Sequence, residues 1–268
     1  MRTDLLEFPN TENQSLRGII TLPDGETNNA VICLHGFERC STTEKKFKTL
    51  ADIFSEKAIA TLRFDFSGCG LSDGNFKTTT IKKQGQEFFN AIQALQNKTG
   101  VQKIDIIAHS LGACVLATQM NKIKEQIGKI VLIAPALNQR DLLRYWFVTG
   151  QMKKANPSIE ITWQNYKDYL DEEDFLKDCQ RDDKMTKANR ISSGYFLSGK
   201  DFDFSDHFTG DNSSILHIHG EKDVAVPRES INVRFENQVV VKNGDHDLEK
   251  PDQMEQWIQK GADFLLKD

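Results

Sequence analysis

The chain has 268 residues, which is enough for one large α/β domain with a smaller insertion and does not require a second domain. Its formal net charge of −5 argues against a surface for nucleic acid or for an anionic membrane, since either would need a basic face. The five cysteines have no metal-type spacing and the amino-terminal segment has no apolar stretch of signal-peptide length, so we predict a protein of the reducing cytoplasm without a metal site.

Short apolar runs rich in β-branched residues alternate along the chain with segments of helical spacing. The runs AVICL, IDIIA and IVLIA are almost continuously apolar, as expected of strands that are covered on both faces. The pattern predicts a doubly wound, mostly parallel sheet with helices on both faces. The expected strands cover residues 16–22, 30–34, 60–64, 103–108, 129–134, 215–219 and 238–241.

Three helices are predicted from apolar residues that recur on one face. The first carries apolar residues from Phe47 to Phe54, and Ser41-Thr-Thr-Glu44 before it has the pattern of a capping box, in which side chains bond the free amides of the first turn. The second runs from Ile81 to Leu95 and is ended by Gly100. The third carries apolar residues between Met254 and Leu265.

The alternation of strands and helices breaks off between residues 137 and 212. This stretch is rich in aromatic residues, has an acidic run from Asp168 to Asp183, and offers only an ambiguous strand at residues 194–197. It is too long for a plain connection, so we expect helices within it. We interpret 137–212 as a cap inserted over the carboxyl edge of the sheet, with 1–136 and 213–268 forming the core.

The strongest chemical signal is Ala108-His109-Ser110-Leu111-Gly112, which runs from an apolar strand directly into a helix. A serine at such a turn projects its hydroxyl above the edge of the sheet, and the residues two positions away on either side must be small. This is the arrangement of a nucleophile elbow, with Ala108 in the place of the first glycine. The alternative is a serine that only caps an ordinary helix.

A serine nucleophile needs a base that is uncharged at neutral pH, and histidine supplies one. His246 is the predicted base, because it lies in a glycine-containing loop between the last expected strand and the last helix, at the carboxyl edge of the sheet. We assign other roles to the remaining five histidines: packing for His109, loop shape for His35, a place in the cap for His207, and one strand face for His217 and His219, where a metal pair would lack a third ligand.

The acid that supports the base is expected in the loop after the preceding strand. Asp223 lies there, and a buried carboxylate at this place would fix the tautomer of the histidine and stabilise the imidazolium formed during attack. Glu221 in the same loop and Asp141, which follows an earlier strand, are alternatives.

Two backbone amides are expected to bind the negatively charged oxygen of a tetrahedral intermediate. The N–H of Leu111 lies at the start of the helix after the serine, where the helix dipole also favours negative charge. The N–H of Phe37, in the loop after the AVICL strand, is the second predicted donor. Since the backbone donates, we expect Phe37→Leu to have a mild effect.

Taken together, these motifs resemble the α/β-hydrolase superfamily. The closest likeness is to small bacterial carboxylesterases of the cinnamoyl and feruloyl esterase type and to serine-aminopeptidase-like hydrolases, along nearly the whole chain except the cap. The chain order of Ser110, Asp223 and His246 is the order known for this superfamily. The motifs that carry the resemblance are Leu34-His35-Gly36-Phe37, the segment from Arg63 to Gly74, Ala108 to Gly112, His219 to Pro227, and Gly244-Asp-His246.

The resemblance implies an α/β-hydrolase fold with an eight-stranded type of sheet, and a cofactor-free serine hydrolase that works through an acyl-enzyme. The glycine-rich segment from Gly68 to Gly74 lacks the spacing of a dinucleotide-binding loop, so no nucleotide is expected. We expect small to medium acyl esters as substrates. The same residues would serve amide, thioester or lactone hydrolysis, or the fold could be kept by a protein that only binds a ligand. A homodimer through aromatic residues of the cap is one possibility for the oligomeric state.

Overall fold

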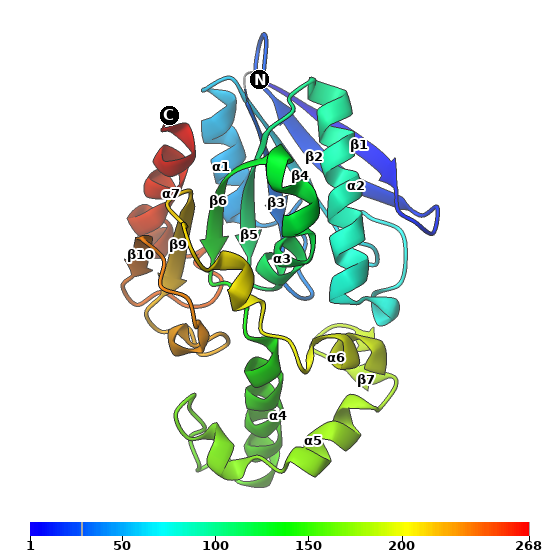
Figure 1. Cartoon of the computed structure of the whole chain (residues 1–268), viewed down its shortest axis with the longest axis vertical. Helices are drawn as coiled ribbons and strands as arrows, with labels where there is room; N and C mark the ends of the chain where they lie inside the picture. Colours follow the sequence, from blue (N-terminus) through cyan, green and yellow to red (C-terminus); the bar gives the residue numbers. More distant parts are fainter. Residues whose placement is uncertain (28, 268) are drawn as a thin grey trace.

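The centre of the molecule is an eight-stranded sheet in which every strand except β2 runs in the same direction (Figure 1). The computed structural model describes residues 1–27 and 29–267. The predicted doubly wound, mostly parallel sheet is confirmed. In their order across the sheet, the strands are β1 (Arg2–Pro9), β2 (Ser15–Leu22), β4 (Ile59–Phe64), β3 (Asn29–Leu34), β5 (Ile104–His109), β6 (Ile127–Ile133), β9 (Ile215–Gly220) and β10 (Asn237–Val241).

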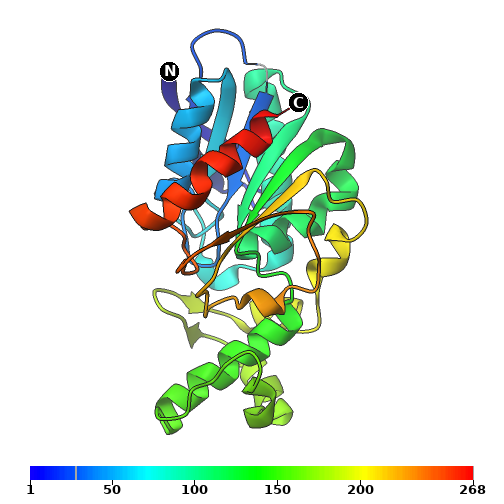
Figure 2. The same cartoon turned by 90° about the vertical axis from the view of Figure 1, so that its left-hand side faces the viewer.

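Helices cover both faces of this sheet. α1 (Lys45–Ser55) and α7 (Pro251–Leu266) pack on one face, and α2 (Ile81–Thr99) and α3 (Leu111–Ile123) pack on the other (Figures 1 and 2). Neighbouring residues of a central strand therefore contact different helices, as Val31 and Ile32 do. This burial on both sides explains why the central strands consist of unbroken apolar runs.

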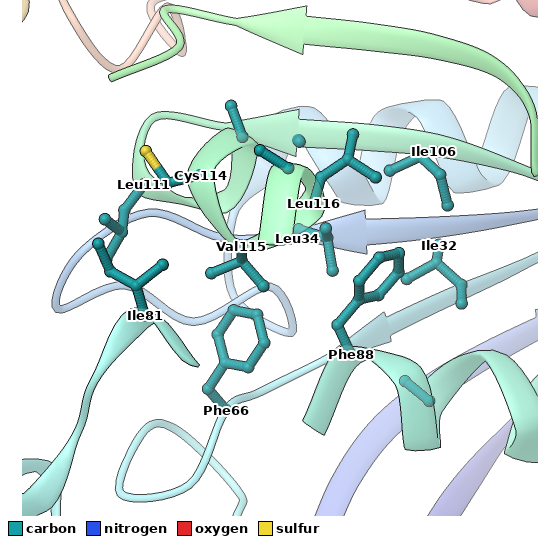
Figure 3. Packing of buried hydrophobic residues seen from close by; sticks show 14 of the residues in the cluster. Ile32, Leu34, Phe66, Ile81, Phe88, Ile106, Leu111, Cys114, Val115 and Leu116 are labelled. Atoms are coloured by element: carbon teal, nitrogen blue, oxygen red, sulfur yellow. The ribbon is translucent and has the colours of Figure 1, made fainter. Parts of the chain in front are cut away.

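The core between the sheet, α2 and α3 is filled by large apolar side chains. Figure 3 shows Phe66 and Phe88 beside Val115 of α3 and Ile32 of β3, and none of these side chains is more than 1% exposed. Burying one such side chain contributes about 1.5–3 kcal/mol to the free energy of folding. The helix that follows Ser110 therefore packs against a closely filled apolar core.

The chain between β6 and β9 leaves the sheet, and most of it lies at the end of the molecule away from both termini (Figures 1 and 2). Its last part, residues 204–214, returns beside the sheet to the amino ends of the strands. We call residues 134–214 the β6–β9 segment. The segment contains α4 (Gln139–Ala155), η3 (Tyr166–Tyr169), α5 (Glu172–Cys179), the hairpin of β7 (Lys184–Met185) and β8 (Arg190–Ile191), α6 (Ser193–Gly199) and η4 (Phe204–Phe208).

None of the helices in the described part of the chain is long and apolar enough to cross a membrane.

The ambiguous strand at residues 194–197 was a wrong interpretation, because this stretch lies in α6. Tyr195 and Gly199 are the buried residues of α6, and their spacing of four places them on one side of a helix. In a strand, Tyr195, Leu197 and Gly199 would all lie on the same face. The structure buries only the pair with helical spacing.

The capping box predicted at Ser41-Thr-Thr-Glu44 was also wrong. The helix begins at Lys45 without a capping side-chain hydrogen bond. The Ser41 hydroxyl instead donates to the carbonyl of Cys33 at 3.1 Å, and the Glu44 carboxylate lies 3.0 Å from the ammonium of buried Lys46. Tertiary contacts of these two side chains have replaced the local pattern.

Candidate active site

Ser110 lies in a strained turn between β5 and α3. Its backbone has φ 53° and ψ −117°, a left-handed conformation that is uncommon for a residue other than glycine. A Cβ atom added to Gly112 would lie 2.6 Å from the carbonyl oxygen of Leu34, so only glycine lets α3 approach β3 this closely. Ala108 is fully buried two residues before the serine. The turn thus has the small neighbours that a serine at the edge of the sheet requires, and Ser110 itself is 7% exposed.

The structure brings together the three side chains that the sequence predicted to act together. The Ser110 hydroxyl lies 2.9 Å from Nε2 of His246, and Nδ1 of His246 lies 2.8 Å from Oδ2 of Asp223. These three residues come from loops after β5, β9 and β10, which all end at the carboxyl edge of the sheet. With the ring hydrogen on Nδ1, His246 donates to Asp223 and can accept the proton of Ser110.

The Asp223 carboxylate is buried and held by several donors. Its Oδ1 accepts the amides of Ala225 at 2.9 Å and Val226 at 2.8 Å. Burial on its own would raise the pKa of Asp223, but hydrogen bonds from His219 and His246 outweigh burial and hold that pKa below its usual range. The Asp223 carboxylate is therefore ionised at neutral pH.

The two alternative acids lie elsewhere. Glu221 accepts the amide of Asn243 at 2.9 Å, and Asp141 lies in the first turn of α4, 3.0 Å from the side-chain amide of Asn138. In the described residues neither carboxylate contacts His246. The geometry therefore favours Asp223 over both.

The two amides predicted to bind an oxyanion belong to the residue after Ser110 and to the loop that follows β3. Among the described residues, no carbonyl or side chain accepts a hydrogen bond from the N–H of Phe37 or of Leu111. A Cβ atom added to Gly36 would lie 3.0 Å from that of Ser110, which places the Phe37 loop directly against the serine. Both amides are therefore available to a ligand near the hydroxyl.

The sequence did not reveal that the Phe37 loop is attached to the β6–β9 segment. The ring of Phe37 lies 5.0 Å from the ring of Tyr195 in α6. The carboxylate of the next residue, Glu38, accepts hydrogen bonds from the Thr186 hydroxyl and from the Asn189 side chain, the latter at 3.0 Å. Both partners lie in the β7–β8 hairpin, so this loop and the hairpin hold one another.

His109 does more than the packing predicted for it. Its Nε2 lies 3.1 Å from the carbonyl oxygen of His246, and its Nδ1 lies 3.6 Å from Oε1 of buried Glu44. Burial, together with the charge of Lys46, lowers the pKa of His109 to about 4. A neutral His109 with its hydrogen on Nε2 donates to the His246 carbonyl and so holds the loop that carries His246.

His35 shapes a loop as expected, whereas His207 lies away from the carboxyl edge over which the cap was predicted. His35 bridges two loops, since its Nδ1 lies 2.8 Å from the Gly36 carbonyl and its Nε2 accepts the amide of Phe66 at 3.1 Å. His207 lines an open groove of about 1060 Å³ at the amino ends of β3, β5, β6 and β9, opposite the edge that carries Ser110. His207 is therefore remote from the serine.

His217 and His219 contact one another. Nε2 of His217 lies 3.0 Å from Nδ1 of His219. Within the described ranges, no group of three or more His, Cys, Asp or Glu residues could hold a metal ion. Burial, with smaller contributions from the charges of His219 and Arg228, lowers the pKa of His217 from 6.5 to about 3.

The low pKa of His217 predicts a loss of stability in acid. The unfolded chain binds a proton at this residue below about pH 6.5, whereas the folded chain does not until about pH 3, so the free energy of unfolding falls as the pH decreases through this window. His217→Phe removes this contribution. From pH 7 to pH 5, we expect the free energy of unfolding of the wild type to fall by about 1–2 kcal/mol more than that of His217→Phe. Urea titrations of both proteins at the two pH values measure this difference. An equal change in the free energy of unfolding of the two proteins would contradict the prediction.

Helix α4 is bonded to the loop that carries Asp223. The indole N–H of Trp146 donates to the carbonyl of Ala225 at 2.6 Å, and the Tyr145 hydroxyl donates to the carbonyl of Val224 at 3.0 Å. The amide of Ala225 in turn donates to Asp223. The β6–β9 segment therefore helps to set the position of the acid.

Trp146→Phe is expected to lower kcat roughly threefold to tenfold with little change in KM, because the ring is kept while the hydrogen bond to the acid loop is lost. Steady-state ester kinetics would check this. Trp163→Phe is the matched control, since the Trp163 ring packs on Tyr145 and, in the described residues, donates no hydrogen bond to the loop that carries Asp223. Equal losses in the two variants would show that aromatic packing, and not the hydrogen bond, is responsible.

The mostly parallel sheet, the strained serine turn and the loops at its carboxyl edge define the α/β-hydrolase fold, as the sequence predicted. A profile of the family described as serine aminopeptidase, S33, matches residues 25–246. The chain belongs to this family.

Solved structures with this fold align over almost the whole chain. Est1E from Butyrivibrio proteoclasticus, solved with ferulic acid bound, is 18% identical with a TM-score of 0.73, and the alignment covers 96% of each chain. The α/β hydrolase GrgF from Penicillium sp. sh18 is 17% identical with a TM-score of 0.68, over 99% of this chain and 98% of that one. At these identities the likeness extends to the fold.

A curated relative is described as an acyl transferase from Aliivibrio fischeri (strain MJ11). It is 26% identical over an alignment of 188 residues, and the match covers 67% of this chain. The match spans 58% of the relative's own length. The likeness therefore concerns a little more than half of that protein.

Proposed function

We propose that the protein is a serine hydrolase that cleaves small to medium acyl esters through an acyl-enzyme, with Ser110 as nucleophile, His246 as base and Asp223 as supporting acid. The observation that carries the proposal is the pair of contacts made by the His246 ring, 2.9 Å to Ser110 and 2.8 Å to Asp223. A protein that only binds a ligand would have no need of this alignment on a strained serine.

The reaction follows from these positions. Oγ of Ser110 forms a bond to the acyl carbon while its proton passes to Nε2 of His246, and the amides of Phe37 and Leu111 stabilise the negative oxygen. His246 then gives that proton to the leaving alcohol as the ester C–O bond breaks. Water repeats the sequence on the acyl-enzyme: it loses a proton to His246, and Ser110 recovers one as the acid departs.

The part of the β6–β9 segment from α4 to α6, which lies within the predicted cap at residues 137–212, would cover the acyl or alcohol part of the substrate. Two of its contacts support this role: the Tyr195 ring against Phe37 and the Trp146 hydrogen bond to the acid loop. Both reach loops that carry proposed catalytic groups. Substrate choice would thus depend on side chains of this segment.

The proposal is tested by acylation. The protein is mixed with p-nitrophenyl acetate or butyrate, nitrophenolate release is followed in the first turnover, and the intact mass is measured after an acid quench. A burst equal to the enzyme concentration, with one acyl group on the peptide that contains Ser110, is the expected result. Absence of Ser110 acylation by both esters would sink the small-acyl esterase proposal.

Acyl transfer is a second candidate, favoured by the likeness to the Aliivibrio fischeri acyl transferase. The acyl-enzyme would be the same, but an alcohol or amine in place of water would remove the acyl group. Adding increasing concentrations of a small alcohol to the ester assay separates the two. A hydrolase forms mainly the free acid, whereas a transferase forms mainly the new ester. A parallel assay with an amino-acid p-nitroanilide tests amide cleavage, which the family description suggests.

A further inference from the structure

Asp223 is contacted by a second histidine that the proposed reaction does not use. His219, near the end of β9, has its Nε2 3.3 Å from Oδ2 of Asp223 and 2.8 Å from the carbonyl oxygen of Val226. The side chains of His219 and Asp223 are 1% and 0% exposed. The same Oδ2 accepts from His246. One carboxylate oxygen therefore lies between two imidazoles.

The partners of His219 fix its tautomer. The Val226 carbonyl can only accept a hydrogen bond, so Nε2 of His219 carries the ring hydrogen. Nδ1 is then an acceptor, and Nε2 of His217 at 3.0 Å supplies the donor. One N–H therefore points from His217 to His219, and one N–H points from His219 to the Val226 carbonyl, with Oδ2 of Asp223 3.3 Å from the same nitrogen.

We propose that His219 is a positioning residue for the supporting acid: its Nε2–H holds Oδ2 of Asp223 in line with His246 and weakens the pull of the carboxylate on the His246 imidazolium. The inference rests on the proposed serine-hydrolase function. The amides of Ala225 and Val226 already hold Oδ1, so the donor from His219 restrains the second oxygen and leaves the carboxylate in a single orientation.

Other titratable groups reach this cluster only indirectly. From α4, the Tyr145 hydroxyl bonds the Val224 carbonyl; from η5 (Arg228–Ser230), the Arg228 charge acts on His217; and from β5, the His109 ring lies 5.0 Å from the His246 ring. In the described residues, none of these three donates a hydrogen bond to Asp223. A change at Asp223 caused by substitution at 219 therefore arises from the contacts of the His219 ring itself, which are the one to Oδ2 of Asp223 and the hydrogen bond to the Val226 carbonyl.

Three variants separate positioning from packing. His219→Leu removes the donor, and we expect kcat to fall about tenfold with KM changed less than about twofold. The midpoint of the acidic limb of kcat/KM should rise by about 0.5–1 pH unit, because a carboxylate with one donor fewer favours the imidazolium more strongly. His219→Gln keeps an N–H near the place of Nε2 and should restore most of kcat and of the midpoint. His217→Leu, which removes a buried imidazole from the same strand but no donor from Asp223, should lower Tm and leave the midpoint in place.

NMR of ¹⁵N-histidine-labelled protein measures the protonation midpoint of the His246 ring directly. It therefore compares the wild type and the three variants without an activity assay. If the wild type hydrolyses no ester, the proposed function has failed, and the NMR midpoints still decide the present inference. A midpoint that rises in His219→Leu and returns in His219→Gln supports it. A midpoint unchanged in His219→Leu overturns it, as does an equal shift in His217→Leu.

Discussion

Ser110→Ala is expected to reduce kcat for p-nitrophenyl butyrate by about 10⁴- to 10⁶-fold. The hydroxyl is the group that His246 contacts at 2.9 Å, and no other hydroxyl in the described residues contacts this base. Any remaining hydrolysis would come from water attacking a substrate polarised by the Phe37 and Leu111 amides. The measurement is steady-state release of nitrophenolate, with KM determined separately for wild type and variant.

The fold of the Ser110→Ala variant is expected to be intact, because alanine keeps the Cβ atom and adds nothing to the turn. Thermal unfolding should give a Tm within a few degrees of wild type. Ser213→Ala is a matched control, since Ser213 is an exposed serine just before β9, at the opposite end of the sheet. Retention of more than about a tenth of wild-type kcat in Ser110→Ala would remove this serine from the reaction.

Asp223→Asn is expected to lower kcat by about 10³- to 10⁴-fold while KM stays within a few fold. The cause is the tautomer of His246. The amides of Ala225 and Val226 require an acceptor at the place of Oδ1, so the NH₂ group of the asparagine would face His246. Nδ1 of His246 must then accept, and the ring hydrogen moves to Nε2, where it prevents the ring from taking the serine proton.

The two alternative acids provide the controls for this prediction. Glu221→Gln and Asp141→Asn remove carboxylates of the same region that do not contact His246, and both should retain kcat within about threefold. A loss in either variant as large as that in Asp223→Asn would contradict the assignment of the acid. The pH profile of Asp223→Asn adds a further check, since its rate should recover in strong alkali, where hydroxide can take the serine proton directly.

Short motifs were enough to predict much of the sheet and the residues that meet at its edge. The turn at Ser110 and the loops of Asp223 and His246 each follow an apolar strand, and parallel strands bring such loops to one edge whatever the details of packing. The central strands were recognisable because burial on both faces leaves unbroken apolar runs. β1 was not predicted, because this edge strand is largely exposed and therefore has no apolar pattern.

The contacts that surround the site could not be predicted, because they join residues far apart in the chain. Glu38 bonds a hairpin about 150 residues away, and Trp146 bonds Ala225 across 79 residues. No local spacing encodes such pairs. Ser41 and Glu44 have the spacing of a capping box, but Glu44 forms a buried ion pair with Lys46 and does not cap the helix. The hydrogen bond from His109 to the His246 loop likewise depends on the approach of two separate loops.

The hydrogen bonds from α4 to the acid loop have a consequence for engineering. In many designs, a new substrate range is sought by exchanging or randomising the helices above a conserved set of reacting groups. In this chain Tyr145 and Trp146 lie on such a helix, yet they bond the backbone beside Asp223. A library that varies these two positions would change turnover and selectivity together. Libraries confined to α5 or the β7–β8 turn, with Glu172, Thr186 and Asn189 kept, would leave the hydrogen bonds to the acid loop in place.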